Sequence, residues 1–323
     1  MSGIYLGVDV GSVSTNFVAL NAEKQVLTSR YLRTRGRPIE AIQTGLRGIH
    51  QELGEVEVKG VGSTGSARTL AGVILGADTV KNEITAHAVA ASLEVPDVRT
   101  VLEIGGQDSK ITILREGVVV DFAMNTVCAA GTGSFLDHQS ERLGVPIEQF
   151  GEKALQSVNP VRIAGRCSVF AESDMIHKQQ MGHDLEDIIK GLSEALVRNY
   201  LNNVGKGKEI LSPVVFQGGV AANRGIKAAF EKELGVEVIV PKHFSIMGAI
   251  GAAILAQETV QDGTTRFRGF KASELSYEAT SFECNGCPNM CEIVNIKSEG
   301  EILARWGGRC EKWEVVERIP VSQ

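Results

Sequence analysis

The sequence lacks any run of about 20 consecutive apolar residues, the length that a membrane-spanning helix needs. Its first residues, MSGIYLGVDVG, also lack the basic region and apolar stretch of a secretory signal. Basic residues are not in excess, since the net charge is −6 and the pI is near 5.7. Nucleic acids and anionic membranes attract basic surfaces. We therefore expect a cytoplasmic protein whose partners include neither a membrane nor a nucleic acid.

Histidine gives no metal site by its spacing. None of the six histidines forms a metal-binding pair with a nearby cysteine or acidic residue, so we expect ordinary surface or hydrogen-bonded side chains. They are His50, His87, His138, His177, His183 and His243. The chain also has six cysteines. In a reducing cytoplasm, cysteines bind metals or carry out redox chemistry more often than they form disulfides.

Two of the cysteines, Cys128 and Cys167, each stand immediately before a segment predicted to be helical. They lie in NTVCAAGTGSFLDHQSERLG and AGRCSVFAESDMIHKQQMG, and Ser134 and Asp137 have the spacing of a helix-capping pair. The positive end of a helix favours the thiolate, the form that binds metal. Two thiolates are half of what a cubane iron–sulfur cluster needs, so a second copy of the chain would supply the other pair.

The last part of the chain holds the other four cysteines. From Thr259 the composition changes, and QDGTTRFRG is typical of a linker. Cys284-x2-Cys287-x3-Cys291 precedes a predicted hairpin, EIVNIK-SEGE-ILARWG, and Cys310 follows it. A module this small has little apolar area to bury, and four thiols in this arrangement indicate a metal site. Zn²⁺ and a second 4Fe–4S cluster both fit this ligand set.

Two parts of the chain share the pattern of a strand, a glycine-containing turn and a strand. Residues 4–10 and 16–20 are predicted strands joined by GSVST, and VLTSRYLR adds a third. TVLEIGGQDSKITILREGVVV repeats the arrangement with a Gly-Gly turn. Asp9-x-Gly11 and Glu103-x-Gly105-Gly106 occupy matching places, which indicates an internal duplication. The backbone N–H groups of such turns can cradle a phosphate.

Helices are predicted between and after these hairpins, at Pro38–Leu53, 81–95 and 185–204. A strand, a Gly-Gly turn and a helix follow in SPVVFQGGVAANRGIKAAFEKELG. The helix SIMGAIGAAILAQE is crowded with glycine and alanine and is too short to span a membrane, so we expect tight packing on a neighbouring element. The alternation of strands and helices predicts an α/β protein.

Five segments in combination resemble the actin/sugar-kinase/acetate-kinase ATPase superfamily. They are the hairpins at Asp9–Thr15 and Gly105–Lys110, the helices at Asn82–Ala91 and Ser245–Ala256, and the strand-turn-helix unit at Phe216–Asn223. Within it the chain resembles the BadF/BadG/BcrA/BcrD-like activator ATPases of 2-hydroxyacyl-CoA dehydratases and benzoyl-CoA reductases. The matching segments are GVDVGSVST, EIGGQDSK, CAAGTGSFLD, RCSVFAES and FQGGVAAN. The resemblance covers about residues 3–258, so the tail lies outside it.

The resemblance implies two ribonuclease-H-like lobes of the actin-like fold, with ATP or ADP in the cleft. Lobe I would comprise residues 1–94 with the returning helix 245–258, lobe II residues 95–244, and the metal-binding tail residues 259–323. One 4Fe–4S cluster would bridge a homodimer through Cys128 and Cys167 of each chain. ATP hydrolysis would drive low-potential electrons from a donor such as ferredoxin or flavodoxin, under anaerobic conditions, into a partner such as a 2-hydroxyacyl-CoA dehydratase.

The nucleotide-binding residues follow from the same resemblance. Asp9 and Asp108 are oxygen ligands suited to Mg²⁺, and either Glu103 or Gln107 would orient the attacking water. Relatives often carry lysine where this chain has Asn16, so we assign the compensation of phosphate charge to Mg²⁺. The residues expected to contact the nucleotide are Asp9, Gly11, Ser12, Val13, Ser14, Thr15, Gly105, Gly106, Gly218, Gly219 and Asn223.

Two other functions compete with this interpretation. The first is a kinase of the same superfamily, acting on a small sugar or carboxylate, with structural cysteines. Such a kinase needs a carboxylate facing the substrate hydroxyl, whereas an activator needs only a group that positions water. The second is a metal-binding scaffold that senses ATP.

Overall fold

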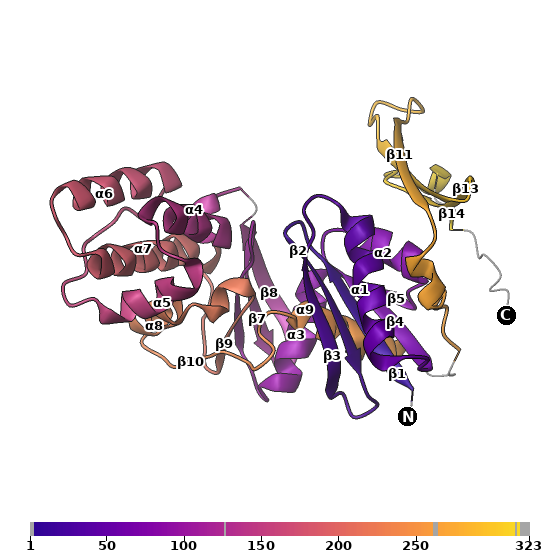
Figure 1. Cartoon of the computed structure of the whole chain (residues 1–323), viewed down its shortest axis with the longest axis horizontal. Coiled ribbons are helices and arrows are strands. Elements are labelled where there is room, and N and C mark those ends of the chain that lie inside the picture. Colours follow the sequence, from indigo (N-terminus) through magenta and orange to yellow (C-terminus); the bar gives the residue numbers. More distant parts are fainter. Residues whose placement is uncertain (1–2, 126, 261–263, 314, 317–323) are drawn as a thin grey trace. The chain divides into compact units, whose positions relative to one another are not determined.

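The chain forms two compact units, shown in Figure 1. The computed structural model describes residues 3–125, 127–260, 264–313 and 315–316. The first unit comprises Met1–Glu83 and Gly248–Gln323, and the second comprises Ile84–Met247. We expected the helix predicted at 81–95 to belong to the first lobe. Its residues from Ile84 on fall in the second unit, where His87 contacts Gln217 and Glu103.

Each unit is built on a five-stranded sheet, and the two sheets have the same topology. The order is β3-β2-β1-β4-β5 in the first and, read from the β8 edge, β8-β7-β6-β9-β10 in the second. The first sheet contains β1 (Ile4–Val10), β2 (Ser14–Leu20), β3 (Val26–Arg33), β4 (Val58–Thr64) and β5 (Thr79–Val80). The second contains β6 (Thr100–Ile104), β7 (Ser109–Arg115), β8 (Val118–Asn125), β9 (Val214–Gln217) and β10 (Val238–Ile239).

The registers of the two hairpins match as well. Asp9 lies opposite Asn16 in the antiparallel pair of β1 and β2. Glu103 lies opposite Lys110 in the pair of β6 and β7. The first strand of each hairpin also pairs in parallel with a third strand: β1 with β4 and β6 with β9. This correspondence confirms the internal duplication that the sequence predicts.

In the first unit, α9 (Met247–Thr259) packs directly on the sheet backbone. A Cβ atom added to Gly7 would overlap the carbonyl oxygen of Ala249, and one added to Gly62 would overlap that of Ala252. This confirms the close packing expected of the glycine- and alanine-rich helix. The other helices of this unit are α1 (Pro38–Leu53) and α2 (Arg68–Leu75), of which α2 was not predicted. No helix in the described part of the chain combines the length and the apolar character that crossing a membrane requires.

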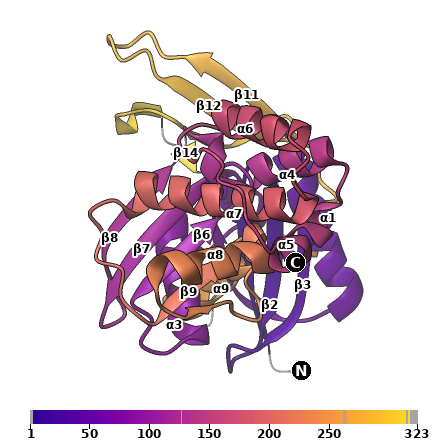
Figure 2. The ribbon, with the colours of Figure 1, turned by 90° about the vertical axis from the view of Figure 1, so that its left-hand side faces the viewer.

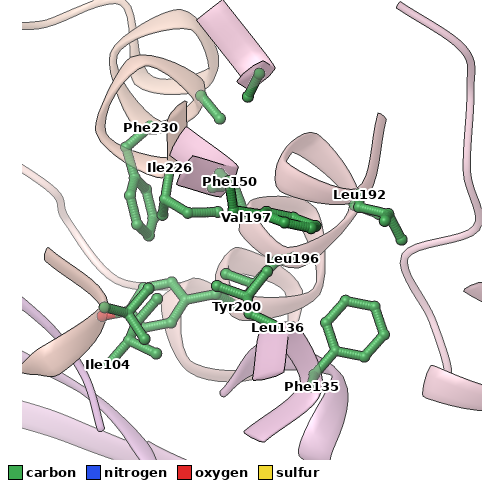
Figure 3. Packing of buried hydrophobic residues seen from close by; sticks show 14 of the residues in the cluster. Ile104, Phe135, Leu136, Phe150, Leu192, Leu196, Val197, Tyr200, Ile226 and Phe230 are labelled. Atoms are coloured by element: carbon green, nitrogen blue, oxygen red, sulfur yellow. The ribbon is translucent and has the colours of Figure 1, made fainter. Parts of the chain in front are cut away.

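In the second unit, α7 is the central helix and contacts α5, α6 and α8 (Figure 2). Its buried side chains join the apolar core with Phe135, Phe150 and Phe230, as Figure 3 shows. A π-helical turn, Leu201–Gly205, follows α7 directly. The helices are α3 (Glu83–Glu94), α4 (Gly133–Leu143), α5 (Ile147–Gln156), α6 (Ser168–Gln180), α7 (Leu185–Tyr200) and α8 (Arg224–Leu234).

The tail forms a small sheet of its own, in the order β11-β12-β13-β14. The predicted hairpin is confirmed as β12 and β13, whereas β11 was not predicted. Ile296 and Leu303 share one buried apolar cluster with the first unit, and Phe270 stacks on His50 at 4.5 Å. The tail therefore shares an apolar core with the rest of the first unit, which its short length alone does not predict. Its strands are β11 (Tyr277–Glu283), β12 (Glu292–Ser298), β13 (Glu301–Trp306) and β14 (Val315–Val316).

Candidate functional site

A mostly buried group of charges, here called the charged cluster, lies at the turn end of the second hairpin and consists of His87, Glu103, Asp108 and Lys110. Lys110 Nζ lies 3.1 Å from Glu103 Oε1 and 2.9 Å from Asp108 Oδ2. Glu103 Oε2 lies 2.9 Å from His87 Nδ1, so both carboxylate oxygens of Glu103 have a partner. The side chains of Lys110 and Glu103 are only 5% and 9% exposed. Attraction between charges is stronger there than in water.

Burial and pairing act in opposite directions on the pKa values of the cluster. Burial disfavours the Glu103 carboxylate, yet the charges of His87 and Lys110 outweigh burial and hold its pKa well below the ordinary value. Burial also works against the charge on Lys110, but Glu103 and Asp108 raise its pKa above the ordinary value. Glu103 and Lys110 are therefore both charged at neutral pH.

Three residues here are absent from the site that the sequence predicts: Lys110, His87 and Gln217. The amide nitrogen of Gln217, at the end of β9, lies 2.6 Å from His87 Nδ1, although the two residues are 130 positions apart. Local patterns give no signal for such a contact. Lys110 could have been found from the duplication, because it faces Glu103 where Asn16 faces Asp9.

The glycine turn of each hairpin is closed by one backbone hydrogen bond. Gly105 N–H donates to the Asp108 carbonyl at 2.9 Å, and Gly11 N–H donates to the Ser14 carbonyl at 2.9 Å. Gln107 is exposed and Asp108 is half-buried, so both side chains reach solvent from the second turn. The other residues expected at the first hairpin, Asp9, Ser12, Val13 and Thr15, lie in the first unit.

The expected adenosine-binding segment begins where β9 ends. Gly218 has a φ of +89°, and a Cβ atom there would overlap the carbonyl oxygen of Ile104, so glycine is required beside β6. Gly219 begins a short turn, and Asn223 Oδ1 accepts the Ile226 N–H at 3.1 Å, which caps α8. Asn223 Nδ2 is buried without a hydrogen-bond partner in the described chain. The segment and the second hairpin thus meet within one unit.

The start of α4 is bonded to the second hairpin. Ser134 does not cap this helix as predicted. Instead its Oγ donates to the Gly106 carbonyl at 2.5 Å, because the hairpin lies within its reach. The N–H groups of Gly133 and Ser134 donate to the carbonyls of Gly105 and Gly106, both at 2.9 Å. A phosphate-type turn is therefore tied to the helix that follows Cys128.

Cys128 and Cys167 each precede a helix, as the sequence predicts. Cys128 leads into a single 3₁₀ turn (Ala129–Gly131) before α4, and Cys167 is the N-cap residue of α6. Asn125 Oδ1 accepts the Cys128 N–H, and Asn125 Nδ2 donates to the Cys128 carbonyl, both at 2.9 Å. The end of β8 thus fixes the conformation of the first cysteine loop.

One buried side chain, which the sequence did not predict, contacts both cysteine loops. Asn199 of α7 is 2% exposed. Its Nδ2 donates to the Gly165 carbonyl at 2.7 Å, just before Cys167, and lies 3.8 Å from Cys128 Sγ. Within a single chain, Asn199 therefore contacts both of the loops that carry the two thiols.

The side chains beside these two cysteines are apolar and exposed. Val127 is 95% exposed, Val169 is 67% exposed and Phe170 is 64% exposed. Isolated exposed apolar residues are ordinary, but these three all lie within three residues of a cysteine. A surface of this kind is typical of a place that another molecule covers.

The predicted four-thiolate site of the tail stays a prediction. In the described chain, no three or more His, Cys, Asp or Glu side chains are grouped so as to hold a metal ion. Cys287 and Cys310 are exposed, whereas Cys284 is buried. The Trp313 Nε1–H and the Gly286 N–H donate to Cys284 Sγ at 3.1 and 3.4 Å and hold the pKa of this thiol below its ordinary value.

Comparison with known proteins agrees with this geometry. Residues 6–256 match the BadF/BadG/BcrA/BcrD ATPase family. The (R)-2-hydroxyglutaryl-CoA dehydratase activating ATPase of Acidaminococcus fermentans is 35% identical over an alignment of 269 residues, and the match covers 79% of this chain and 98% of that protein. The 2-hydroxyisocaproyl-CoA dehydratase activator of Clostridioides difficile is 33% identical over 266 residues, 80% of this chain and 96% of that protein.

A solved structure supports the same conclusion. The activator of the 2-hydroxyisocaproyl-CoA dehydratase from Clostridium difficile with bound ADPNP superposes with a TM-score of 0.73 at 31% identity, covering 80% of this chain and 96% of that one. The α/β fold expected from the resemblance is thereby confirmed. The tail beyond residue 256 lies outside the family match. The protein belongs to the BadF/BadG/BcrA/BcrD ATPase family.

Proposed function

We propose that this protein hydrolyses ATP in order to pass low-potential electrons to a partner iron–sulfur enzyme, such as a 2-hydroxyacyl-CoA dehydratase. One observation carries the proposal: the turn at Gly105 and Gly106 is hydrogen-bonded to the start of α4, five residues beyond Cys128. Nucleotide binding at this turn would therefore change the position of the start of α4 and of the nearby Cys128. The relatives named as dehydratase activators support this class of partner.

In this proposal the two hairpins hold the phosphates of ATP or ADP with backbone N–H groups. Asp9 and Asp108 hold Mg²⁺ through its waters. Gln107 orients the attacking water, since both oxygens of Glu103 already have partners. Gly218, Gly219 and Asn223 bind the adenosine, and the unpartnered Asn223 Nδ2 supports a ligand there.

Cys128 and Cys167 of two copies of the chain would hold one 4Fe–4S cluster across a homodimer. A cluster of this type supplies a one-electron reductant when a donor such as ferredoxin or flavodoxin has reduced it. The residues fit the group, because both thiols stand at helix starts on loops fixed by Asn199. The exposed Val127, Val169 and Phe170 support a partner surface at the same place.

Iron analysis of the full chain, purified without oxygen, tests this proposal. We expect brown protein with about four irons per dimer, and loss of that iron in Cys128→Ser. Cys310→Ser is the matched control and should keep the iron. A colourless wild-type protein, or a Cys128→Ser dimer with full iron content, would contradict the bridging cluster and favour the kinase interpretation.

For the tail we propose a Zn²⁺ site formed by Cys284, Cys287, Cys291 and Cys310, with a second 4Fe–4S cluster as the competing outcome. The two N–H groups directed at Cys284 Sγ support it, since such donors stabilise a metal-bound thiolate. Zinc analysis of the full chain decides between them. We expect about one zinc per chain in the wild type and none in Cys284→Ser. Extra iron in place of zinc would make the tail a redox centre.

A further inference from the structure

The end of α7 carries a buried amide that contacts both cysteine loops. Asn199 Nδ2 donates to the Gly165 carbonyl at 2.7 Å and lies 3.8 Å from Cys128 Sγ. On its other side, Asn199 Oδ1 accepts from Asn203 Nδ2 at 2.9 Å. A buried amide that lacks partners is costly. These contacts therefore fix the position of the two loops relative to α7.

The next residue, Tyr200, contacts the second hairpin (β6 and β7), where the proposed function places the phosphates. Tyr200 is fully buried, and its Oη donates to the Lys110 carbonyl at 2.5 Å. Lys110 in turn belongs to the charged cluster. The Tyr200 ring packs edge-on against Phe230, with centroids 5.2 Å apart, and lies in the core drawn in Figure 3. Successive helix residues are turned by about 100°. Asn199 and Tyr200 therefore point in different directions from the same turn of α7, the first toward the cysteine loops and the second toward the second hairpin.

Close packing at two glycines leaves the cysteine loops little room to move independently of α7. A Cβ atom on Gly131 would lie 2.8 Å from Asn199 Oδ1, and one on Gly165 would lie 2.8 Å from the Ala195 carbonyl. The π-helical turn at Leu201–Gly205 follows at once, and such turns occur frequently at functional sites. A displacement at Lys110 would therefore reach α7 through Tyr200 and the two loops through the neighbouring Asn199.

We propose that Asn199 and Tyr200 are positioning residues that couple the state of the phosphate hairpin to Cys128 and Cys167 together. The inference rests on the proposed function, because it assumes that a nucleotide binds at the hairpin. It goes further by assigning the connection to two side chains of α7. The bond from Ser134 to Gly106 reaches the Cys128 side, whereas Asn199 contacts both cysteine loops.

Thiol reactivity in the full chain, with iron removed by a chelator under anaerobic conditions, tests this coupling. Alkylation of Cys128 and Cys167 by iodoacetamide is followed by peptide mass spectrometry, with Mg²⁺ and either ADP or a non-hydrolysable ATP analogue. In the wild type we expect the rates to differ at least about fivefold between the two nucleotides. Tyr200→Phe and Asn199→Asp should bind both nucleotides normally but lose that difference. Ser193→Ala, which removes a buried hydroxyl bonded within α7, should keep it.

The outcomes separate the two proposals. If the wild type binds no nucleotide, the proposed function fails, and this inference fails with it. If the wild type binds nucleotide but its thiols do not respond, or if Tyr200→Phe responds as the wild type does, the inference alone is overturned. Should Asn199→Asp not fold, Tyr200→Phe decides the question, because losing one hydroxyl leaves the ring packing in place.

Discussion

Lys110 occupies the place in the second hairpin that Asn16 occupies in the first. Since Asn16 carries no charge, we expected Mg²⁺ to balance the charge of the phosphates. The second unit in addition holds a buried cation, Lys110, between Glu103 and Asp108. Removing one partner of a buried ion pair leaves the other charge unpaired. The residues of the charged cluster should therefore depend strongly on one another.

Replacing Glu103 with glutamine should lower the free energy of unfolding by about 3–5 kcal/mol at neutral pH, because Lys110 and His87 lose their charged partner. Urea denaturation of the two proteins measures this difference. Glu209→Gln removes a carboxylate that is paired with Arg115 but 73% exposed, and should change little. Equal stability of Glu103→Gln and the wild type would show that the cluster contributes nothing to folding.

The same pair of proteins gives a pH dependence. The pKa of Glu103 is lowered from the ordinary 4.5 in the folded state. Its contribution is therefore fully present above pH 4.5 and is lost as the pH falls through the folded-state pKa. The difference in unfolding free energy between wild type and Glu103→Gln should stay constant from neutral pH down to about 5 and shrink below the ordinary pKa. If the difference in unfolding free energy grew as the pH fell, the pKa of Glu103 would have to be raised in the folded state rather than lowered.

In the proposed function Asp108 organises Mg²⁺. Its carboxylate is 38% exposed, so loss of its pair with Lys110 should cost little stability, and turnover should suffer more than folding. Asp108→Asn keeps the shape of the side chain but removes its charge. We expect ATP hydrolysis to fall about 10–100-fold, as is usual when a group that orients the ligands of a metal is lost. Asp137→Asn on the exposed face of α4 is the control and should hydrolyse ATP normally. Unchanged turnover in Asp108→Asn would place the metal elsewhere.

At the scale of elements, the contact between α9 and the first sheet depends on the absence of side chains. Gly7 in β1 and Gly62 in β4 both face carbonyl oxygens of α9. Backbone atoms cannot rotate away as a side chain can, so an added methyl group must push the helix off the sheet. The glycines of these strands are therefore packing residues, and the low polarity of α9 reflects burial within the unit.

Gly62→Ala should destabilise the protein by about 1–3 kcal/mol or more, because the new Cβ would overlap the Ala252 carbonyl. Gly60→Ala on the same strand is a matched control. Its Cβ would meet mainly side-chain atoms, with Tyr5 Cδ1 at 3.2 Å, and should cost less. Thermal unfolding of both variants measures the difference. If both variants melt alike, close packing of α9 is not what those glycines provide.

At the scale of the whole molecule, the proposed cluster requires two chains, and the exposed apolar side chains lie where the chains would meet. Val127, Val169 and Phe170 flank the two cysteine loops. A charge placed there would be desolvated in a dimer but not in a monomer, so it would oppose association without affecting the fold.

Phe170→Asp should shift the anaerobically purified protein from dimer to monomer, with loss of the bridging iron. Sedimentation velocity gives the association state, and circular dichroism checks the fold. Leu155→Asp places the same charge on α5, where the wild-type residue is also exposed at 42%, and should remain dimeric. A Phe170→Asp protein that stays dimeric would move the interface away from these loops.

The sequence by itself determined the local elements and the repeated hairpins. Residues 26–33 and Pro38–Leu53 match β3 and α1 in the structure, because strand alternation, helix periodicity and a proline at the helix start are local signals. The glycine turns and the helices after both cysteines follow from neighbouring residues in the same way. The duplication follows from a comparison of two such local patterns. Helix α2 escaped prediction because its sequence continues a glycine-rich bend.

Only the tertiary structure decided which distant side chains meet. His87 and Gln217 are 130 positions apart, and Asn199 and Cys128 are 71 positions apart, so no local periodicity connects either pair. The same holds for the tail, whose short length did not predict that its apolar residues join the core of the first unit. Spacing along a chain records which groups can be neighbours on one element, whereas burial and pairing across elements depend on how the whole chain packs.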